Sequence, residues 1–500
     1  MPMTSVKTIF FAFFTLISLS ASAQTISATV VDTKTGEPIP FATVETGKNQ
    51  GVITNEEGVF TVLVDRIKSP NDSIYISSMG YEKKGITYEA SQGGSIQLVP
   101  KAFELQSVFV SNQNLSAEEI VEKVKENLTK NYTVDVSRKK IFFRQSDFNR
   151  MEKVDFGFKK STIEELNKNL IDSIARLVPR KSSYYREVVG DFYGDYSKHK
   201  LFVDKAAELY DKSKDLSMDG LSEKMERIFK ENVKPDSYLK IKSGIFGTKV
   251  QLDSLADADE DAKAVKVEVE NNAEKKHYFQ QNIKDRISEL YEELFFNEDS
   301  KLDILEKSNR YRFELQNYTF IDGEPVFIIS FEPKGKKDFK GVMYVNTADF
   351  AVMRLEFDNV RPLRRFGLLG IKFRQNVYRG KMLFMKDVTG AYSPRYIELE
   401  DGSFFGVDRP LKVIEKNKHV KGRRKQNELS LQLDVQMTNI EKYELVVFDS
   451  ESISEGAYEL AKENKNVEAT YLSKYDPNFW AGYTIMEPNA AIQSFTVLEE

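Results

Sequence analysis

The sequence has no cysteine in its 500 residues, only three histidines and one tryptophan. Without cysteine the chain can form neither disulfides nor thiolate zinc sites, and it lacks the thiol that carries a lipid anchor. A peptidase-like zinc site needs a histidine three residues before a glutamate. None of His199, His277 and His419 has a glutamate at that spacing. We therefore expect no metal centre and no cofactor, and cysteine-based catalysis is excluded.

Charge of one sign is not in excess either. The chain has 72 Lys and Arg against 77 Asp and Glu, a net charge of −5, so a broad attraction to nucleic acid has no support. Charged residues make up 30% and aromatic residues 12%. This composition is typical of a folded, well-solvated protein, and the many Phe and Tyr residues favour β-sheet. The sequence motifs of a serine-hydrolase elbow, a phosphate loop and a dinucleotide-binding turn are absent.

Long apolar runs are missing except at the N-terminus. Lys7 precedes the run Ile9–Leu19, and the small residues Ala21-Ser22-Ala23 follow it, a pattern typical of a signal peptide. The run is too short to cross about 30 Å of hydrocarbon as a helix. We predict a signal peptide at 1–23 and an exported mature chain without a transmembrane helix, in the periplasm or associated with the outer membrane. The alternative is a buried N-terminal helix.

Residues 24–110 contain short strands separated by turns. Turn chemistry is clearest in Asp32–Pro38 and in Asn55–Gly58, where Gly58 can take a positive φ. The expected strands are 26–31, 41–44, 59–64, 73–77 and 95–99. Short strands with turns roughly every 8 to 12 residues predict an all-β sandwich.

Four blocks of this segment carry a resemblance to a known family. They are Thr35–Val44 (TGEPIPFATV), Thr54–Phe60 (TNEEGVF), Ile76–Tyr81 (ISSMGY) and Leu105–Val110 (LQSVFV). In this order they resemble the carboxypeptidase regulatory-like domain, and Ala28 is a departure where the family often has Gly. The resemblance implies a transthyretin-like β-sandwich without an active site, of the kind found at the front of exported and outer-membrane proteins.

The next region, 111–310, is expected to be a helix-rich α+β unit. Ser116 and Glu119 form a capping box, and the apolar residues after them have helical spacing, which predicts a helix that ends near Asn131. Further elements expected here are a strand at 141–144, helix over most of 198–232 and a helix at 283–296.

An acidic stretch interrupts this region. Its members are Asp253, Asp257, Asp259, Glu260 and Asp261. They could offer oxygen ligands to calcium, but the glycine at the sharp turn and the distal bidentate glutamate of an EF-hand are missing. We predict a solvated, mobile insertion near 253–275.

From Tyr311 onward the hydrophobic period changes to two, which predicts strands with one buried face. The most regular example is the row Leu429, Leu431, Leu433, Val435 and Met437, which alternates with polar residues. The segment Ile321–Glu324 predicts a turn. The architecture expected for 311–500 is a large curved antiparallel sheet, covered on one side by helices or by a ligand, followed by a C-terminal tail.

This region is similar, more loosely, to lipoprotein-carrier-like envelope proteins. The similarity runs from Tyr311 through Asp322-Gly323, Phe331–Lys334 and Gly341–Val345 to Val352–Leu355. It implies a half-open barrel that is lined by apolar side chains and can hold acyl chains. The alternative is that the protein's own helices fill the concave face.

Two features are candidate contacts for a lipid or protein partner. The first is a basic cluster made of Lys416, Lys418, Lys421, Arg423, Arg424 and Lys425, with Lys412 before it. It could meet lipid phosphates, or it is a solvated hairpin loop. The second is Trp480 in the turn-rich closing stretch, which could bind a partner at the surface or pack on the sheet edge.

These patterns predict a multidomain protein in which an N-terminal all-β sandwich precedes an α+β region with a large curved antiparallel sheet. The expected function is that of a non-catalytic exported envelope protein that binds a lipid, a lipoprotein or a protein partner at the outer membrane. We expect no catalytic residue. A structural or assembly module of the envelope and a carboxylate-dependent hydrolase remain as alternatives.

Overall fold

The computed structural model describes residues 25–47, 50–63, 73–87, 94–101, 115–234, 236–244, 246–251, 272–386, 390–419 and 424–497. The predicted signal peptide (1–23) and the acidic residues 253–261 lie outside the described residues. Of the predicted insertion near 253–275, only residues 272–275 are described, and they begin helix α7 (Asn272–Glu292).

The N-terminal part is a β-sandwich of two small sheets, as predicted. Its strands are β1 (Thr25–Asp32), β2 (Thr43–Gly47), β3 (Gln50–Ile53), β4 (Val59–Leu63), β5 (Ser73–Ser77), β6 (Lys84–Thr87) and β7 (Ser95–Leu98). One sheet has the order β4-β1-β7 and the other β3-β2-β5-β6. Val30, Val44 and Phe60 are fully buried in the sandwich core. Gly58 is required in its turn, because its φ is +71° and a Cβ would lie 2.7 Å from the carbonyl oxygen of Val30.

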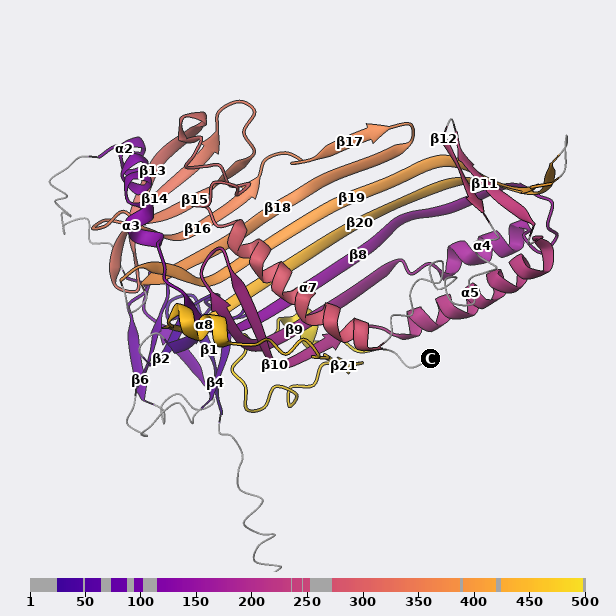
Figure 1. The fold of residues 1–500 in the computed structure, drawn as a ribbon. Helices are drawn as coiled ribbons and strands as arrows, with labels where there is room; N and C mark the ends of the chain where they lie inside the picture. Colours follow the sequence, from indigo (N-terminus) through magenta and orange to yellow (C-terminus); the bar gives the residue numbers. More distant parts are fainter. Residues whose placement is uncertain are drawn as a thin grey trace, which may run out of the picture.

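The remaining strands form one large sheet, which is antiparallel apart from the pairing of β10 with β21 (Figure 1). They are β8 (Ser137–Ser161), β9 (Lys181–Gly194), β10 (His199–Leu209), β11 (Ser237–Ser243), β12 (Phe246–Gln251), β13 (Tyr311–Ile321), β14 (Glu324–Pro333), β15 (Phe339–Asn346), β16 (Val352–Asn359), β17 (Arg365–Leu368), β18 (Ile371–Lys386), β19 (Tyr392–Asn417), β20 (Lys425–Ser452) and β21 (Thr470–Leu472). Their order is β13-β14-β15-β16-β18-β19-β20-β8-β9-β10-β21, while β17 pairs with β18 and β11 pairs with β12 and β19. The predicted curved antiparallel sheet is therefore present, and its longest strands reach well beyond the sandwich.

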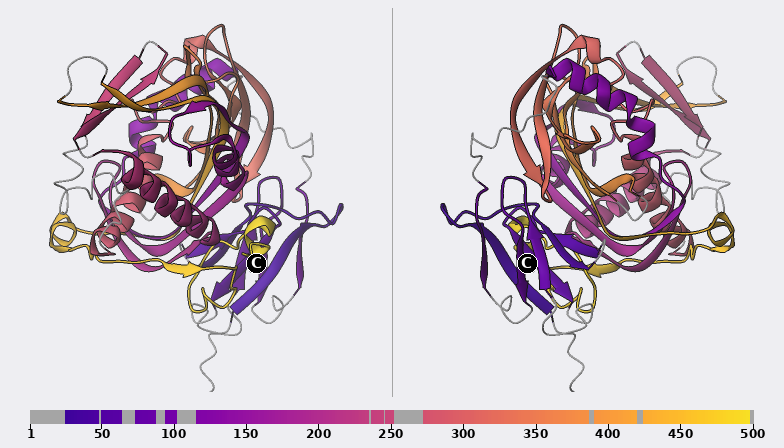
Figure 2. Two further views of the ribbon diagram at one scale, coloured as in Figure 1. Left: turned by 90° about the vertical axis from the view of Figure 1, so that its right-hand side faces the viewer. Right: turned by 90° about the vertical axis from the view of Figure 1, so that its left-hand side faces the viewer.

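The helices lie mainly on one face of this sheet. In the described residues the helices besides α7 are α2 (Ala117–Glu126), α3 (Leu128–Tyr132), α4 (Lys168–Leu177), α5 (Ser213–Asn232), α8 (Glu455–Leu460), α9 (Ala490–Gln493) and the 3-10 turn η4 (Ser308–Arg310). The predicted capping box starts α2: the Ser116 N–H donates to Glu119 Oε2 at 2.7 Å, and the Glu119 N–H donates to Ser116 Oγ at 3.2 Å. In Figure 2 the sheet curves around the helices that cover its inner face.

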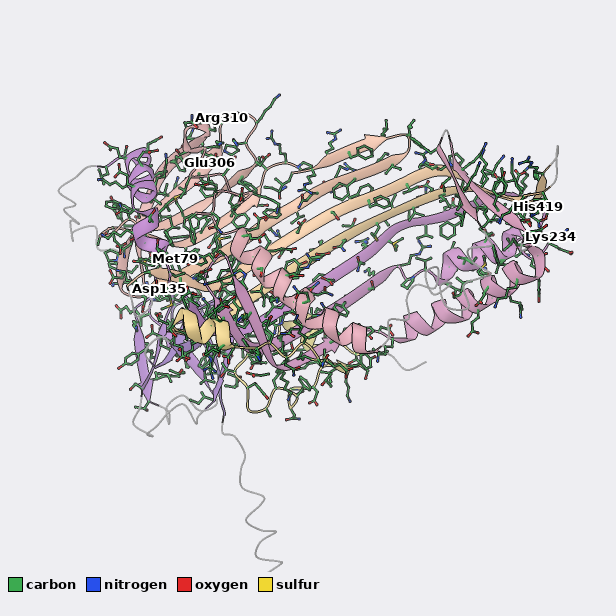
Figure 3. The ribbon with its side chains drawn as sticks, in the orientation of Figure 1. Met79, Asp135, Lys234, Glu306, Arg310 and His419 are labelled. Carbon is green, nitrogen blue, oxygen red and sulfur yellow. The ribbon has the colours of Figure 1, made fainter. Side chains whose placement is uncertain are left out.

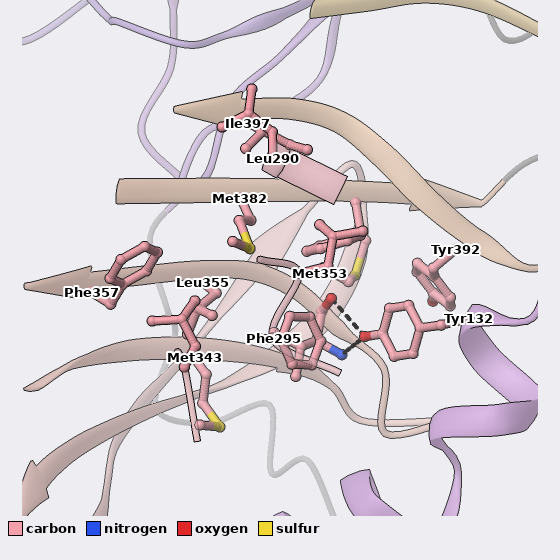
Figure 4. Packing of buried hydrophobic residues seen from close by; sticks show 14 of the residues in the cluster. Tyr132, Leu290, Phe295, Met343, Met353, Leu355, Phe357, Met382, Tyr392 and Ile397 are labelled. Atoms are coloured by element: carbon pink, nitrogen blue, oxygen red, sulfur yellow. Dashed lines mark hydrogen bonds between the residues drawn. The ribbon is translucent and has the colours of Figure 1, made fainter. Parts of the chain in front are cut away.

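We define the inner face by the odd-numbered residues of β20. Near the sandwich this face is packed against α7: Tyr443 and Leu445 of β20 share one core with Ile283 and Ile287 of α7. Figure 4 shows part of this core, where the Tyr132 hydroxyl donates to the carbonyl oxygen of Val352 and accepts from its N–H, at 2.9 and 2.6 Å. This proximal part of the inner face is thus filled by the protein's own side chains.

The outer face carries the even-numbered residues of β20, and the sandwich is built onto its proximal part. Val446 and Phe448 belong to the same core as the interior of the sandwich, and residues of the C-terminal segment such as Ile485 complete it. Glu56 of the sandwich forms an ion pair with Lys442 of β20, with 2.7 Å between Oε1 and Nζ. The sandwich and the large sheet therefore share one continuous apolar core.

The helix predicted over 198–232 is wrong for its first part, because residues 199–209 form strand β10 and only 213–232 form a helix. The error has two physical causes. A bulge between Val203 and Lys205 shifts the alternation, and both faces of the strand are buried. Leu201 and Ala206 face the inner core while Leu209 faces the outer one, so the apolar spacing imitates that of a helix.

Candidate functional site

Beyond the part that α7 covers, the inner face carries a largely apolar surface formed by four long strands. Directly opposite residues of antiparallel strands lie on the same face. Val435 of β20 lies opposite Val407 of β19 and Val154 of β8. The surface, which we call the trough, consists of Met151, Val154, Phe156, Phe158, Ile371, Phe373, Phe405, Val407, Leu411, Leu431, Leu433, Val435 and Met437.

The trough differs from the core beside it in being open to solvent. Most of its side chains are half-buried, and Phe405 is 38% exposed. The outer face between them carries polar residues such as Gln432 and Asp434. Leaving apolar surface in water costs about 25 cal/mol per Å², so a contiguous open patch favours an occupant.

The trough has defined ends and a size suited to an extended apolar chain. At one end Leu429 packs against a small core of Ile163, Leu166 and Ile228, which Leu170 of α4 and Met225 of α5 also contact, and at the other the α7 core begins near Tyr443. From Leu431 to Met437 the strand rises roughly 20 Å, and four strands span roughly 14 Å across. One leaflet of a bilayer has about 15 Å of hydrocarbon. The dimensions therefore fit an acyl chain.

One buried cation lies on the same face. Arg409 of β19 is opposite Leu433 and only 6% exposed. Its Nε–H donates to Ser243 Oγ at 2.8 Å, its Nη2 donates to the Ser243 carbonyl oxygen, and its guanidinium stacks 5.2 Å from the ring of Phe246. The turn between β11 and β12 thus fixes the guanidinium at the border of the trough, where it can meet an anionic head group.

The basic cluster lies where the β19–β20 hairpin ends, far from the sandwich, and Figure 3 labels the neighbouring Lys234 and His419 at that end. The predicted hairpin is confirmed, because Lys416 and Lys425 are register partners. Arg424 and Lys425 are exposed, Lys416 and Lys418 are half-buried, and Lys421 and Arg423 lie outside the described residues.

Part of this basic charge is neutralised within the protein. Glu428, with a side chain only 3% exposed, forms ion pairs with Lys412 at 3.2 Å, with Lys160 at 2.9 Å and with Lys425. Three lysines therefore share one buried carboxylate, which reduces the charge available to a lipid phosphate. The structure does not bring this cluster together with Trp480, which lies near the sandwich.

The expectation of a surface contact through Trp480 needs correction. Trp480 is 4% exposed and belongs to the core of the outer face. Its Nε1–H donates to Glu187 Oε2 at 2.9 Å, and its ring meets that of Phe142 edge-on at 6.2 Å. The residue anchors the C-terminal segment to the sheet, because the indole N–H finds a buried carboxylate rather than water.

A pocket of about 530 Å³ lies on the outer face between Glu56 of the sandwich and strands β14 to β19. Its charged lining residues are Glu56, Glu332, Lys340, Glu356, Asp358, Arg379, Lys381, Glu398 and Glu400. Glu398 pairs with Lys381 and Lys442, at 3.1 and 3.2 Å. Burial tends to raise the pKa of Glu398, but these two lysines hold it below its ordinary value. Such a carboxylate is a poor general acid.

In the part of the chain that the structure describes, no group of three or more His, Asp or Glu side chains could hold a metal ion. None of the helices there is long and apolar enough to span a membrane.

Sequence reasoning found only one strand of the trough, the alternating row Leu429 to Met437. It missed the contributions of β8, β18 and β19 and the guanidinium of Arg409. The alternation of Ile371 with Phe373 and of Phe405 with Val407 was a usable signal. No sequence signal marks the position of the Arg409 guanidinium, because it depends on a turn that lies about 165 residues earlier in the chain.

Comparison with protein families gives one match. Residues 26–110 match the family described as the CarboxypepD_reg-like domain. The match confirms the resemblance of the N-terminal segment and agrees with the β-sandwich found there. None of the curated proteins matches the chain.

Several solved structures also match the chain. A LolA superfamily protein from Nitrosomonas europaea is 10% identical, with 70% of this chain and 98% of the other covered and a TM-score of 0.16. A domain described as an outer membrane lipoprotein-sorting protein from Vibrio parahaemolyticus is 10% identical, with 68% and 97% covered and a TM-score of 0.20. The MucA/MucB complex of Pseudomonas aeruginosa gives 8% identity, 65% and 93% coverage and a TM-score of 0.16. Because TM-scores this low reflect poor superposition, we infer nothing about function from these structures.

Proposed function

We propose that the chain is a non-catalytic, exported envelope protein that binds an amphiphile, with the acyl part of the ligand lying in the trough. The observation that supports this most is the half-exposed apolar surface between α7 and the α4/α5 pair. Its neighbours on the outer face are mostly polar, so the apolar surface is confined to one face and is not a general property of these strands.

The proposed ligand has an anionic head group. Arg409 lies on the trough side of the sheet with two donors fixed by Ser243, and a buried guanidinium favours a carboxylate or a phosphate. The sandwich has a docking or adaptor role in this proposal, because it matches the CarboxypepD_reg-like domain and shares a core with the sheet.

The first test is extraction of the purified, detergent-free protein followed by mass spectrometry. We expect an acyl-bearing amphiphile in the extract of the wild type. The second is titration with a fluorescent fatty acid, comparing the wild type with the double variant Val407→Asn and Val435→Asn. Two polar amides facing the ligand should weaken binding at least about tenfold.

Val99→Asn is the matched control, because Val99 is 46% exposed on the sandwich and far from the trough. It should bind the probe as the wild type does. Trp480 lies on the outer face, so its emission reports whether the trough variant keeps its fold. Equal affinity of wild type and trough variant, with unchanged Trp480 emission, would contradict the proposal.

A further inference from the structure

Two neighbouring turns at the end of the trough expose large apolar side chains. We call this surface the tip: Phe246 at the β11–β12 turn and Phe366, Leu368 and Leu369 at the β17–β18 turn, which are 54%, 50%, 55% and 50% exposed. Figure 1 shows the ends of β17 and β12 close together at the upper right. Arg409 lies between the two turns. It donates a hydrogen bond to Ser243 of the β11–β12 turn, and it packs so closely on the β17–β18 turn that a Cβ added at Gly370 would lie 3.0 Å from the Arg409 Cγ.

The backbone of the β17–β18 turn has a defined conformation. Leu369 and Gly370 have φ of 49° and 83°, the signs of a type I′ hairpin turn. The Asp408 N–H of β19 donates to the Gly370 carbonyl oxygen at 2.7 Å. A leucine in the left-handed region is unfavourable, and Gly or Asn is the usual residue there. A defined backbone therefore holds an apolar side chain in solvent against its conformational preference, which points to a function for it.

The same hairpin concentrates positive charge on its outer face. Arg365 lies directly opposite Arg374, and Lys372 follows on the same face opposite Gly367. Like charges directly opposite each other destabilise a sheet. Within the described residues, no ion pair is found for these three side chains. From 359 to 386 the sequence has eight Lys and Arg and no Asp or Glu, and four of the eight, Arg361, Arg379, Lys381 and Lys386, form ion pairs with carboxylates from outside this stretch.

We propose that the tip docks on the surface of an anionic lipid membrane. Phe366, Leu368, Leu369 and Phe246 enter the boundary between head groups and acyl chains, and the basic outer face of the hairpin meets the lipid phosphates. Apolar insertion combined with a basic flank is what stable interfacial binding requires, since neither alone gives a firm attachment. The like-charge pair Arg365 and Arg374 is then relieved by anions. This inference does not depend on whether the trough holds a ligand.

The experiment is co-sedimentation of the full mature protein with vesicles of phosphatidylcholine alone and with phosphatidylglycerol added. We expect binding to the anionic vesicles that weakens at 0.5 M salt. The tip variant carries Phe366→Ser, Leu368→Ser and Leu369→Asn, and its control carries Val99→Ser and Leu460→Ser at exposed sites elsewhere. The charge variant carries Arg365→Gln, Lys372→Gln and Arg374→Gln, and its control Lys130→Gln, Lys462→Gln and Lys465→Gln.

Because the charge variant lacks three positive charges, its partitioning to anionic vesicles should fall on the order of a hundredfold. The charge control should partition as the wild type does. The tip variant should likewise lose binding to anionic vesicles while its far-ultraviolet circular dichroism stays that of the wild type. Absence of wild-type binding to anionic vesicles, or wild-type binding by the tip variant, overturns the proposal. Self-association that the tip variant abolishes, seen by sedimentation velocity without vesicle binding, would assign the tip to a second copy of this chain and also overturn it.

Discussion

Removal of Arg144 should loosen the attachment of the C-terminal segment and the sandwich to the sheet. Arg144 is 1% exposed between the outer face and the segment around Met486. Its Nε–H donates to Glu187 Oε1 at 2.7 Å, its Nη2 donates to the Met486 carbonyl oxygen at 2.8 Å, and Nη1 lies 3.7 Å from Glu444 Oε2. Glu187 also accepts from Trp480. One guanidinium thus compensates two buried carboxylates.

The substitution Arg144→Met keeps the side-chain volume but leaves Glu187 and Glu444 without that partner. Breaking one partner of a buried ion pair costs about 3–5 kcal/mol. Burial already holds the pKa of Glu444 above its ordinary value. In the variant Glu444 should bind a proton more readily in the folded state than in the unfolded state. The penalty should therefore be largest at neutral pH and shrink as the pH falls.

The assay is urea unfolding followed by Trp480 fluorescence and by far-ultraviolet circular dichroism. Because Trp480 is the single tryptophan, its emission reports the junction directly. We expect the fluorescence transition of Arg144→Met to lose about 3–5 kcal/mol at pH 7. The double variant Arg144→Met with Glu187→Gln should recover about 2 kcal/mol, because it removes one of the two carboxylates that lost the guanidinium. A single variant within about 1 kcal/mol of the wild type would refute this account of the junction.

Three further predictions concern single residues. His199 is half-buried, and its pKa is lowered to about 4, chiefly by desolvation. Since its unfolded pKa is about 6.5, the stability of the wild type relative to His199→Gln should fall by about 3 kcal/mol between pH 7 and pH 4 in urea titrations. Arg409→Gln should weaken binding of an anionic fatty acid about tenfold more than that of the corresponding neutral alcohol, measured by probe displacement; equal losses would remove Arg409 from head-group recognition. Leu369→Asn should raise the free energy of unfolding by about 0.5–1 kcal/mol, because Asn tolerates the left-handed region; a loss of stability would contradict the turn geometry.

Local rules predicted several elements because their causes lie close together in sequence. The capping box of α2 needs only Ser116 and Glu119, and the predicted turn at Ile321–Glu324 needs only Asp322 and Gly323, which both have positive φ. Strand β10 was misjudged because its apolar spacing reflects a bulge and two different cores, neither of which is visible in a single segment.

The site depends on contacts between distant segments, so less of it was predictable. The row Leu429 to Met437 shows which residues share a face, but whether that face is open depends on where α7, α4 and α5 lie. Trp480 is 293 residues from the carboxylate that accepts its N–H, and the turn-rich sequence around it favours exposure. The basic cluster was visible in sequence, but not the buried Glu428 that neutralises part of it.

The central claim is that the trough is the place where an acyl chain binds, and photo-crosslinking tests it most directly. The purified wild type would be irradiated with a fatty acid that carries a diazirine near the end of its chain, and the labelled peptides mapped by mass spectrometry. We predict labels within 151–158, 405–411 and 431–437, and their loss in the Val407→Asn and Val435→Asn double variant. Labels confined to the sandwich, or a pattern unchanged in that variant, would contradict the account.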